Sequence, residues 1–240
     1  MTAESNALNP ESTDRPQSDD PDRVGVDTVL SPVYRTAIAW AQIIAVFVLL
    51  ELALWAPSRE IRDYWAVIAA MMIIAALLSD RSSFGQLGFR LPSAGGLGVM
   101  LGSALVTIVA LLTVTRWAGG AIPAVRIWPN TTTILGYLIW AFTQEFILQA
   151  LFFRRFERLY GSSAAVWMAS TLFAAVHLPN PFLTTATLCG ALFFCEMFRR
   201  YRSLYPLAVM HAILGLTIAV IVPDSLLHHM RVGIGYLQYR

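Results

Sequence analysis

Long apolar runs separated by short polar segments dominate the chain after residue 32. An α-helix rises about 1.5 Å per residue, so about 20 apolar residues cross the ~30 Å hydrocarbon core of a bilayer. The turn sequence Leu178-Pro179-Asn180-Pro181 divides one long run into two helices, because proline interrupts helical hydrogen bonding. The pattern predicts seven spans, of which the second is slightly short: 36–56, 64–79, 91–115, 131–153, two between Arg158 and Arg199, and 203–223.

The first 32 residues have a different composition, with seven acidic residues, two arginines and four prolines. Such a segment buries too little apolar surface to offset the entropy of ordering, so we expect a disordered tail at 1–32. It also lacks the basic start and apolar core of a secretory signal, so the first span is expected to remain as an anchor. The expected organisation is this tail, a membrane domain at 33–222 with its core at 131–222, and a short carboxyl-terminal tail at 223–240.

The distribution of arginine predicts the orientation. With seven spans, the amino-terminal side holds 11 of the 17 basic residues and the opposite side holds 6. The positive-inside rule then places the amino terminus and the Arg154-Arg155 and Arg199-Arg200 segments in the cytoplasm. The basic residues form no stripe of the kind that binds nucleic acid, so we expect no nucleic-acid partner. The composition, 57% hydrophobic and 13% charged, predicts an integral membrane protein, which we expect in a bacterial plasma membrane.

One acidic residue, Glu145, lies within the fourth predicted span. An ionised carboxylate there costs roughly 2.5–3.5 kcal/mol, so it needs a partner, a proton or a water-filled cavity. At about 100° per residue, Gln144, Glu145 and Gln149 form one polar arc, which is expected to face a polar intramembrane cavity. The alternative is that these side chains only join helices by hydrogen bonds.

Two histidines lie in later predicted spans, His177 at the end of the fifth and His211 in the seventh. Each alone is typical of a hydrogen-bonded structural residue. Together with a buried glutamate they are the groups that activate water or stabilise an oxyanion. We therefore expect Glu145, His177 and His211 to share one site. Cys189 and Cys195 are six residues apart, and we expect both to be small core residues.

Three motifs on successive helices resemble those of the CAAX-processing and bacteriocin-processing intramembrane proteases, the CPBP or abortive-infection family. The family pattern is Glu-Glu-x-x-x-Arg, Phe-x-x-x-His and His-x-x-x-Asn. The chain has Gln144-Glu145-x-x-x-Gln149, Phe173-x-x-x-His177 and His211-x-x-x-Gly215, and the resemblance covers about residues 84–222. In the family, the first glutamate and the second motif's histidine are thought to activate water, while the third motif stabilises the oxyanion.

The resemblance implies an all-α membrane bundle that hydrolyses a peptide bond. It implies catalytic roles for Glu145, His177 and His211, with Gln144 at the position of the first glutamate. The residues that it implies along the cavity are Gln149, Phe173, Asn180 and Gly215. The chain departs from the family at Gln144, Gln149 and Gly215, and a neutral amide cannot act as a base.

Three functions therefore remain open. The first is an intramembrane endopeptidase that cleaves a membrane-associated protein with glutamate- and histidine-activated water. The second is a catalytically inactive pseudoprotease that binds or regulates membrane peptides. The third is a small transporter that uses Glu145 and the histidines as a proton relay, although the chain lacks the internal repeat common in transporters.

No cofactor is predicted. The sequence has no His-Glu-x-x-His motif, so a metal would need ligands from separate helices, namely Glu145, His177 and His211, and we predict none. The expected partners are the lipid bilayer and a membrane-anchored peptide or protein substrate. The pattern specifies neither the substrate's identity nor an oligomeric state.

Overall fold

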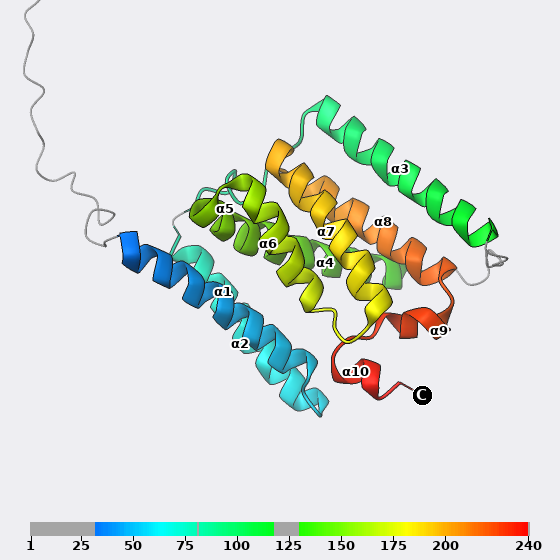
Figure 1. Ribbon diagram of the computed structural model, residues 1–240, viewed down its shortest axis with the longest axis horizontal. Coiled ribbons are helices and arrows are strands. Elements are labelled where there is room, and N and C mark those ends of the chain that lie inside the picture. Colours follow the sequence, from blue (N-terminus) through cyan, green and yellow to red (C-terminus); the bar gives the residue numbers. More distant parts are fainter. Residues whose placement is uncertain (1–31, 81, 118–129, 240) are drawn as a thin grey trace, which may run out of the picture.

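The computed structural model describes residues 32–80, 82–117 and 130–239, which form helices and connecting segments without a strand (Figure 1). This confirms the predicted all-α class. The tail expected at 1–32 lies outside the described residues, apart from Pro32, at which α1 begins. The helices are α1 Pro32–Leu54, α2 Arg59–Leu78, α3 Ala94–Trp117, α4 Thr131–Glu145, the π-helix η4 Phe146–Phe153, α5 Arg154–Tyr160, α6 Ser162–Ala175, α7 Pro181–Tyr201, α8 Tyr205–Ile221, α9 Asp224–Leu227, the 3₁₀-helix η5 His228–Met230 and α10 Ile234–Leu237.

Each predicted apolar run forms a helix, but the predicted number of seven spans is not confirmed. Five helices in the described part of the chain are long and apolar enough to cross a membrane. A sixth is obtained if α8 and the following Asp224–Met230, bent by 120°, count as one span. α6 has only 14 residues, about 21 Å. It is short because the preceding helix continues to Tyr160 and ends at Gly161, whose φ is 81°.

Two boundaries also differ from the prediction. The second span is a full 20 residues, because the helix begins at Arg59 and includes charged residues that the hydropathy pattern left outside. Ser58 caps this helix by accepting a hydrogen bond from the Ile61 amide. Arg154 and Arg155 lie in a helix rather than in a loop, because α4, η4 and α5 follow one another without a break.

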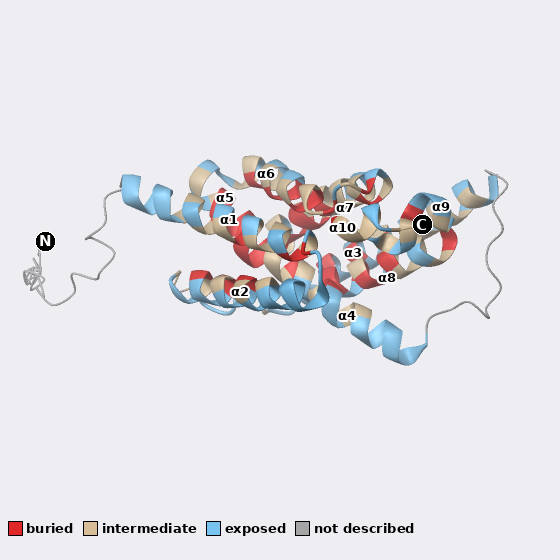
Figure 2. Cartoon of the chain, turned by 90° about the horizontal axis from the view of Figure 1, so that it is seen from below, coloured by how far each residue is buried: buried red, intermediate tan, exposed pale blue. Residues whose placement is uncertain are grey.

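The helices surround a core built on the π-helix η4. Leu148, Leu151, Phe152 and Phe153 of this helix have no exposed surface, and η4 contacts α2, α6 and α7. Buried residues gather in the middle of the bundle, and the outer faces are exposed (Figure 2). Large apolar side chains such as that of Ile139 are exposed on those faces, as expected of a surface that contacts lipid.

The α1–α2 hairpin and α3 lie on opposite sides of the central helices (Figure 1). α3 packs along α8. The hairpin is joined to the core through Arg155, which is 2% exposed. Its Nε donates to Gln42 Oε1 at 2.9 Å and its Nη2 donates to the Ala76 carbonyl at 2.7 Å. These bonds hold both helices of the hairpin against α5.

Candidate functional site

A cavity of about 750 Å³ opens between α3, α4, α7 and α8. Its lining is mostly apolar, whereas the sequence predicted a polar cavity. The ionisable or amide side chains in the wall are those of Tyr137, Gln144, His177, Cys189, His211 and His229. A cavity with few polar groups in an apolar wall is typical of a ligand or substrate site.

Glu145 and His211 form a polar contact beside this cavity. His211 Nδ1 lies 2.9 Å from Glu145 Oε1, and Gln149 Nε2 donates to Glu145 Oε2 at 3.1 Å. Glu145 and Gln149 have no exposed surface and do not line the cavity, whereas His211 does. The predicted polar arc is therefore divided, with Gln144 at the cavity and Glu145 behind His211.

This contact defines which nitrogen of His211 is free. When Glu145 is ionised, its carboxylate can only accept, so in the neutral imidazole Nδ1 carries the proton that it donates to Glu145, and Nε2 has a lone pair. The imidazole stacks on the Phe194 ring, with centroids 5.4 Å apart and planes at 14°. The carboxylate and the ring together fix the orientation of His211.

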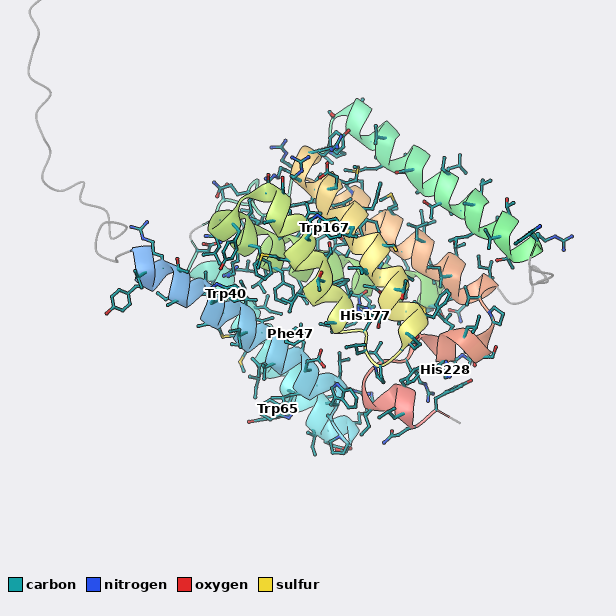
Figure 3. The ribbon with its side chains drawn as sticks, in the orientation of Figure 1. Trp40, Phe47, Trp65, Trp167, His177 and His228 are labelled. Atoms are coloured by element: carbon teal, nitrogen blue, oxygen red, sulfur yellow. The ribbon has the colours of Figure 1, made fainter. Side chains whose placement is uncertain are left out.

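His177 follows the end of α6 (Figure 3). It lines the same cavity as His211. Its Nδ1 lies 2.9 Å from the Phe173 carbonyl oxygen. A carbonyl also only accepts, so Nδ1 donates and Nε2 is again the atom with a lone pair. The rings of Phe173 and His177 are in contact, with centroids 5.2 Å apart. The two histidines thus come together at one cavity as expected, while Glu145 reaches it only through His211.

Two residues expected along the cavity lie elsewhere. Gln149 is packed behind Glu145, and Asn180 is completely buried at the start of α7. Asn180 Oδ1 accepts from the Leu183 amide, and its Nδ2 donates to the carbonyls of Leu227 and Arg231. Asn180 therefore caps α7 and holds the carboxyl-terminal segment. Phe173 and Gly215 do line the cavity.

The carboxyl-terminal segment folds back onto the turn between α6 and α7. Residues 224–237 form short helices, and the Gly233 amide donates to the Leu178 carbonyl at 2.8 Å. This contact gives the Leu178 carbonyl, in the turn between α6 and α7, a hydrogen-bond partner. The segment also brings His229 to the cavity wall. Sequence reasoning missed this role, because His229 follows the last apolar run.

Sequence reasoning also missed Tyr137 and misplaced Cys189. Tyr137 precedes Gln144 by seven residues, which is two helical turns, so it shares the face of α4 that meets the cavity. That spacing was the available signal. Cys195 is buried as expected, whereas Cys189 is exposed and lines the cavity. Among residues 32–80, 82–117 and 130–239, no three His, Cys, Asp or Glu side chains are grouped closely enough to hold a metal ion.

The comparison with protein families confirms the resemblance seen in the sequence. Residues 126–217 match the family model described as type II CAAX prenyl endopeptidase, Rce1-like. The matched segment includes Tyr137, Glu145, His177, His211 and Gly215. No curated protein and no solved structure matches the chain. The family match and the apolar helices together identify an integral membrane protein.

Proposed function

We propose that this chain, whose residues 126–217 are similar to the Rce1-like type II CAAX prenyl endopeptidases, is an intramembrane endopeptidase. Its substrate is a membrane-associated protein or peptide. The observation that carries the proposal is the buried Glu145–His211 contact at 2.9 Å, with His211 on the wall of a cavity. A histidine held by a carboxylate on one nitrogen and free on the other can act as a general base.

In the proposed reaction, His211 Nε2 takes a proton from water as the water oxygen attacks the scissile carbonyl carbon. Glu145 stabilises the imidazolium that forms and keeps its orientation. The tetrahedral intermediate then collapses, the C–N bond breaks, and His211 returns the proton to the leaving nitrogen. His177 Nε2 accepts a hydrogen bond from the same water and positions it. His211 thus takes the basic role, whereas the resemblance implied a role at the oxyanion.

The orientation proposed for the protein has its amino terminus in the cytoplasm. Ion pairs of Arg158 with Asp80 and of Arg202 with Glu157 bring the end of α2 and the arginine-bearing ends of α5 and α7 to one side. α1 begins on this side because it is antiparallel to α2. The positive-inside rule makes this side cytoplasmic. The membrane proposed is the plasma membrane of a bacterium.

The test is cleavage of membrane-anchored peptides by the full chain in proteoliposomes, with fragments identified by mass spectrometry. Wild type is expected to release fragments, and His211→Ala to lose that activity because the base is gone. Glu51→Gln is the matched control, since it neutralises a glutamate of α1 that does not line the cavity. Absence of fragments with wild type, or undiminished cleavage by His211→Ala, would overturn the proposal.

A further inference from the structure

Tyr137 of α4 lies directly over Gly215 of α8. A Cβ atom built on Gly215 would be 2.8 Å from Tyr137 Cζ and 2.9 Å from Cε1, with the phenol oxygen closer still. Carbon atoms in contact are normally about 3.5–4.0 Å apart, so only glycine allows this approach. The absence of a side chain at 215 creates the space that the Tyr137 hydroxyl occupies.

This hydroxyl lies on the same wall as His211. Gly215 follows His211 by four residues, so both occupy one face of α8, and a Cα–Cβ bond at 215 would tilt toward His211. The Tyr137 oxygen occupies the space into which that Cβ would project. Both Tyr137 and His211 line the cavity, so a group bound against His211 is also next to the tyrosine hydroxyl.

The hydroxyl is free to donate to such a group. A tyrosine hydroxyl in an apolar environment usually has a hydrogen-bond partner. In the part of the chain that the structure describes, no side chain or backbone group forms one with Tyr137, although α4 and α8 pack closely there. The donor is therefore available to a ligand in the cavity.

The proposed reaction needs a donor for the oxyanion, and neither histidine supplies one before the proton transfer. The Nε2 atoms of His177 and His211 both have lone pairs, and Glu145 and Gln149 lie behind the wall. Negative charge that develops on the carbonyl oxygen needs a preorganised donor in a site of low polarity. A neutral phenol meets this need without adding a buried charge.

We propose that Tyr137 is a further catalytic residue, whose hydroxyl donates a hydrogen bond to the carbonyl oxygen of the scissile peptide. This inference rests on the endopeptidase function proposed above. When water attacks, the carbonyl π electrons move to the oxygen, and the Tyr137 O–H stabilises that charge without transferring its proton. When the intermediate collapses, the electrons return and the C–N bond breaks.

The first experiment compares the kinetics of wild type and Tyr137→Phe in proteoliposomes. Removal of one oxyanion donor is expected to lower kcat by roughly 100- to 1000-fold. KM should change less than about threefold, because the ring remains and the lost interaction belongs to the transition state. Tyr205→Phe is the matched control, because it removes the same oxygen from a tyrosine outside the cavity lining. Melting temperatures show whether each variant is folded.

The second experiment measures binding, so it remains decisive whether or not peptide is cleaved. A membrane-anchored phosphinic peptide mimics the tetrahedral intermediate, and the same peptide with an N-methylated scissile amide mimics the ground state. Tyr137→Phe is expected to lose affinity for the phosphinic peptide and to keep its affinity for the N-methylated peptide. If wild type binds the phosphinic peptide preferentially but does not cleave peptides, the endopeptidase function fails while the donor role of Tyr137 stands.

Three results would overturn the assignment of Tyr137. One is a kcat of Tyr137→Phe within about threefold of wild type, which would make the tyrosine only a packing residue. Another is equal loss of affinity for both peptides, since a lost oxyanion donor affects only the tetrahedral mimic. The third is wild-type protein that binds neither peptide, which would overturn the function and the inference together.

Discussion

Glu145 Oε1 and His211 Nδ1 are 2.9 Å apart, at the point where α4 ends and the π-helix η4 begins. Segments of π-helix are rare and are found frequently at functional sites. Here the segment follows Glu145 directly and carries Gln149, which holds the second carboxylate oxygen. The acid therefore contacts the cavity through a histidine and not by itself.

We first predict that Glu145→Gln lowers kcat by roughly 10³- to 10⁴-fold, because an amide no longer holds the histidine in the required tautomer. Gln144→Glu is the comparison, since it adds a carboxylate next to the cavity. It should leave kcat unchanged or lower, because a second carboxylate beside the first adds like-charge repulsion in a site of low polarity. Steady-state kinetics on both variants measures this. Full activity in Glu145→Gln would contradict a role for the carboxylate.

The packing of Tyr137 on Gly215 predicts the cost of any side chain at that position. Gly215→Asn should destabilise the protein by about 1–3 kcal/mol, because the new Cβ overlaps the tyrosine ring. Adding Tyr137→Ala should recover most of this loss. Gly136→Ala is the control, since a Cβ there meets no atom within 4 Å. Thermal unfolding in detergent measures the four proteins, and equal stability of Gly215→Asn and wild type would contradict the overlap.

The accessibility of the cavity can be tested by labelling Cys189, which lines it. Cys189 is exposed and lines the cavity, whereas Cys195 is completely buried. A small water-soluble maleimide should therefore label wild type once, and Cys189→Ser should not be labelled. Peptides that bind in the cavity should slow the labelling of Cys189. Mass spectrometry gives the extent of labelling, and fast modification of Cys195 would show that the helices pack differently.

The ion pair between Asp80 and Arg158 predicts a dependence of stability on pH. Burial alone would raise the pKa of Asp80, but hydrogen bonds from Arg158 and the positive charge of Arg158 and Arg155 outweigh it and hold the pKa below its usual 3.8. A lowered carboxyl pKa stabilises the folded state above the unfolded pKa, and this contribution is lost as the pH falls below about 3.8. Its size should be about 1 kcal/mol or less, because Arg158 is half exposed.

Unfolding curves of wild type and Asp80→Asn measure this contribution. The free energies of unfolding of the two proteins should differ between about pH 5 and pH 7, which is roughly one to three units above the usual pKa of Asp. The two values should converge as the pH falls below that pKa. If the difference in the free energy of unfolding were the same at every pH, the ion pair between Asp80 and Arg158 would not be the cause of the pH dependence.

The proposed orientation predicts opposite accessibility for two exposed positions. Ser163 lies just after the turn at Gly161, on the arginine-rich side, and Gln238 follows α10 near the other end of α1. Cysteines introduced singly at these positions, in a chain without Cys189 and Cys195, should be labelled from opposite sides of the membrane. Ser163→Cys should react from the cytoplasm. Labelling of both from one side would contradict the arrangement of the helix ends.

The sequence by itself determined the helical class and the residues that carry chemistry. Long apolar runs predict membrane helices because a bilayer admits few other structures. Glu145, His177 and His211 stand out because polar groups are costly in such helices. The motifs around them were sufficient to indicate a resemblance, which the comparison over residues 126–217 then confirmed.

Only the tertiary structure decided how these residues meet. Hydropathy gives the extent of an apolar run but not where capping begins a helix, so α2 is longer and α6 shorter than a span count suggests. A helical wheel drawn at about 100° per residue assumes a regular α-helix, so it does not predict the π-helix after Glu145. It also does not predict that His211 lies between Glu145 and the cavity. The approach of Tyr137 to Gly215 depends on the relative rotation and depth of α4 and α8. Packing between helices distant in the chain sets both quantities, and no local pattern encodes them.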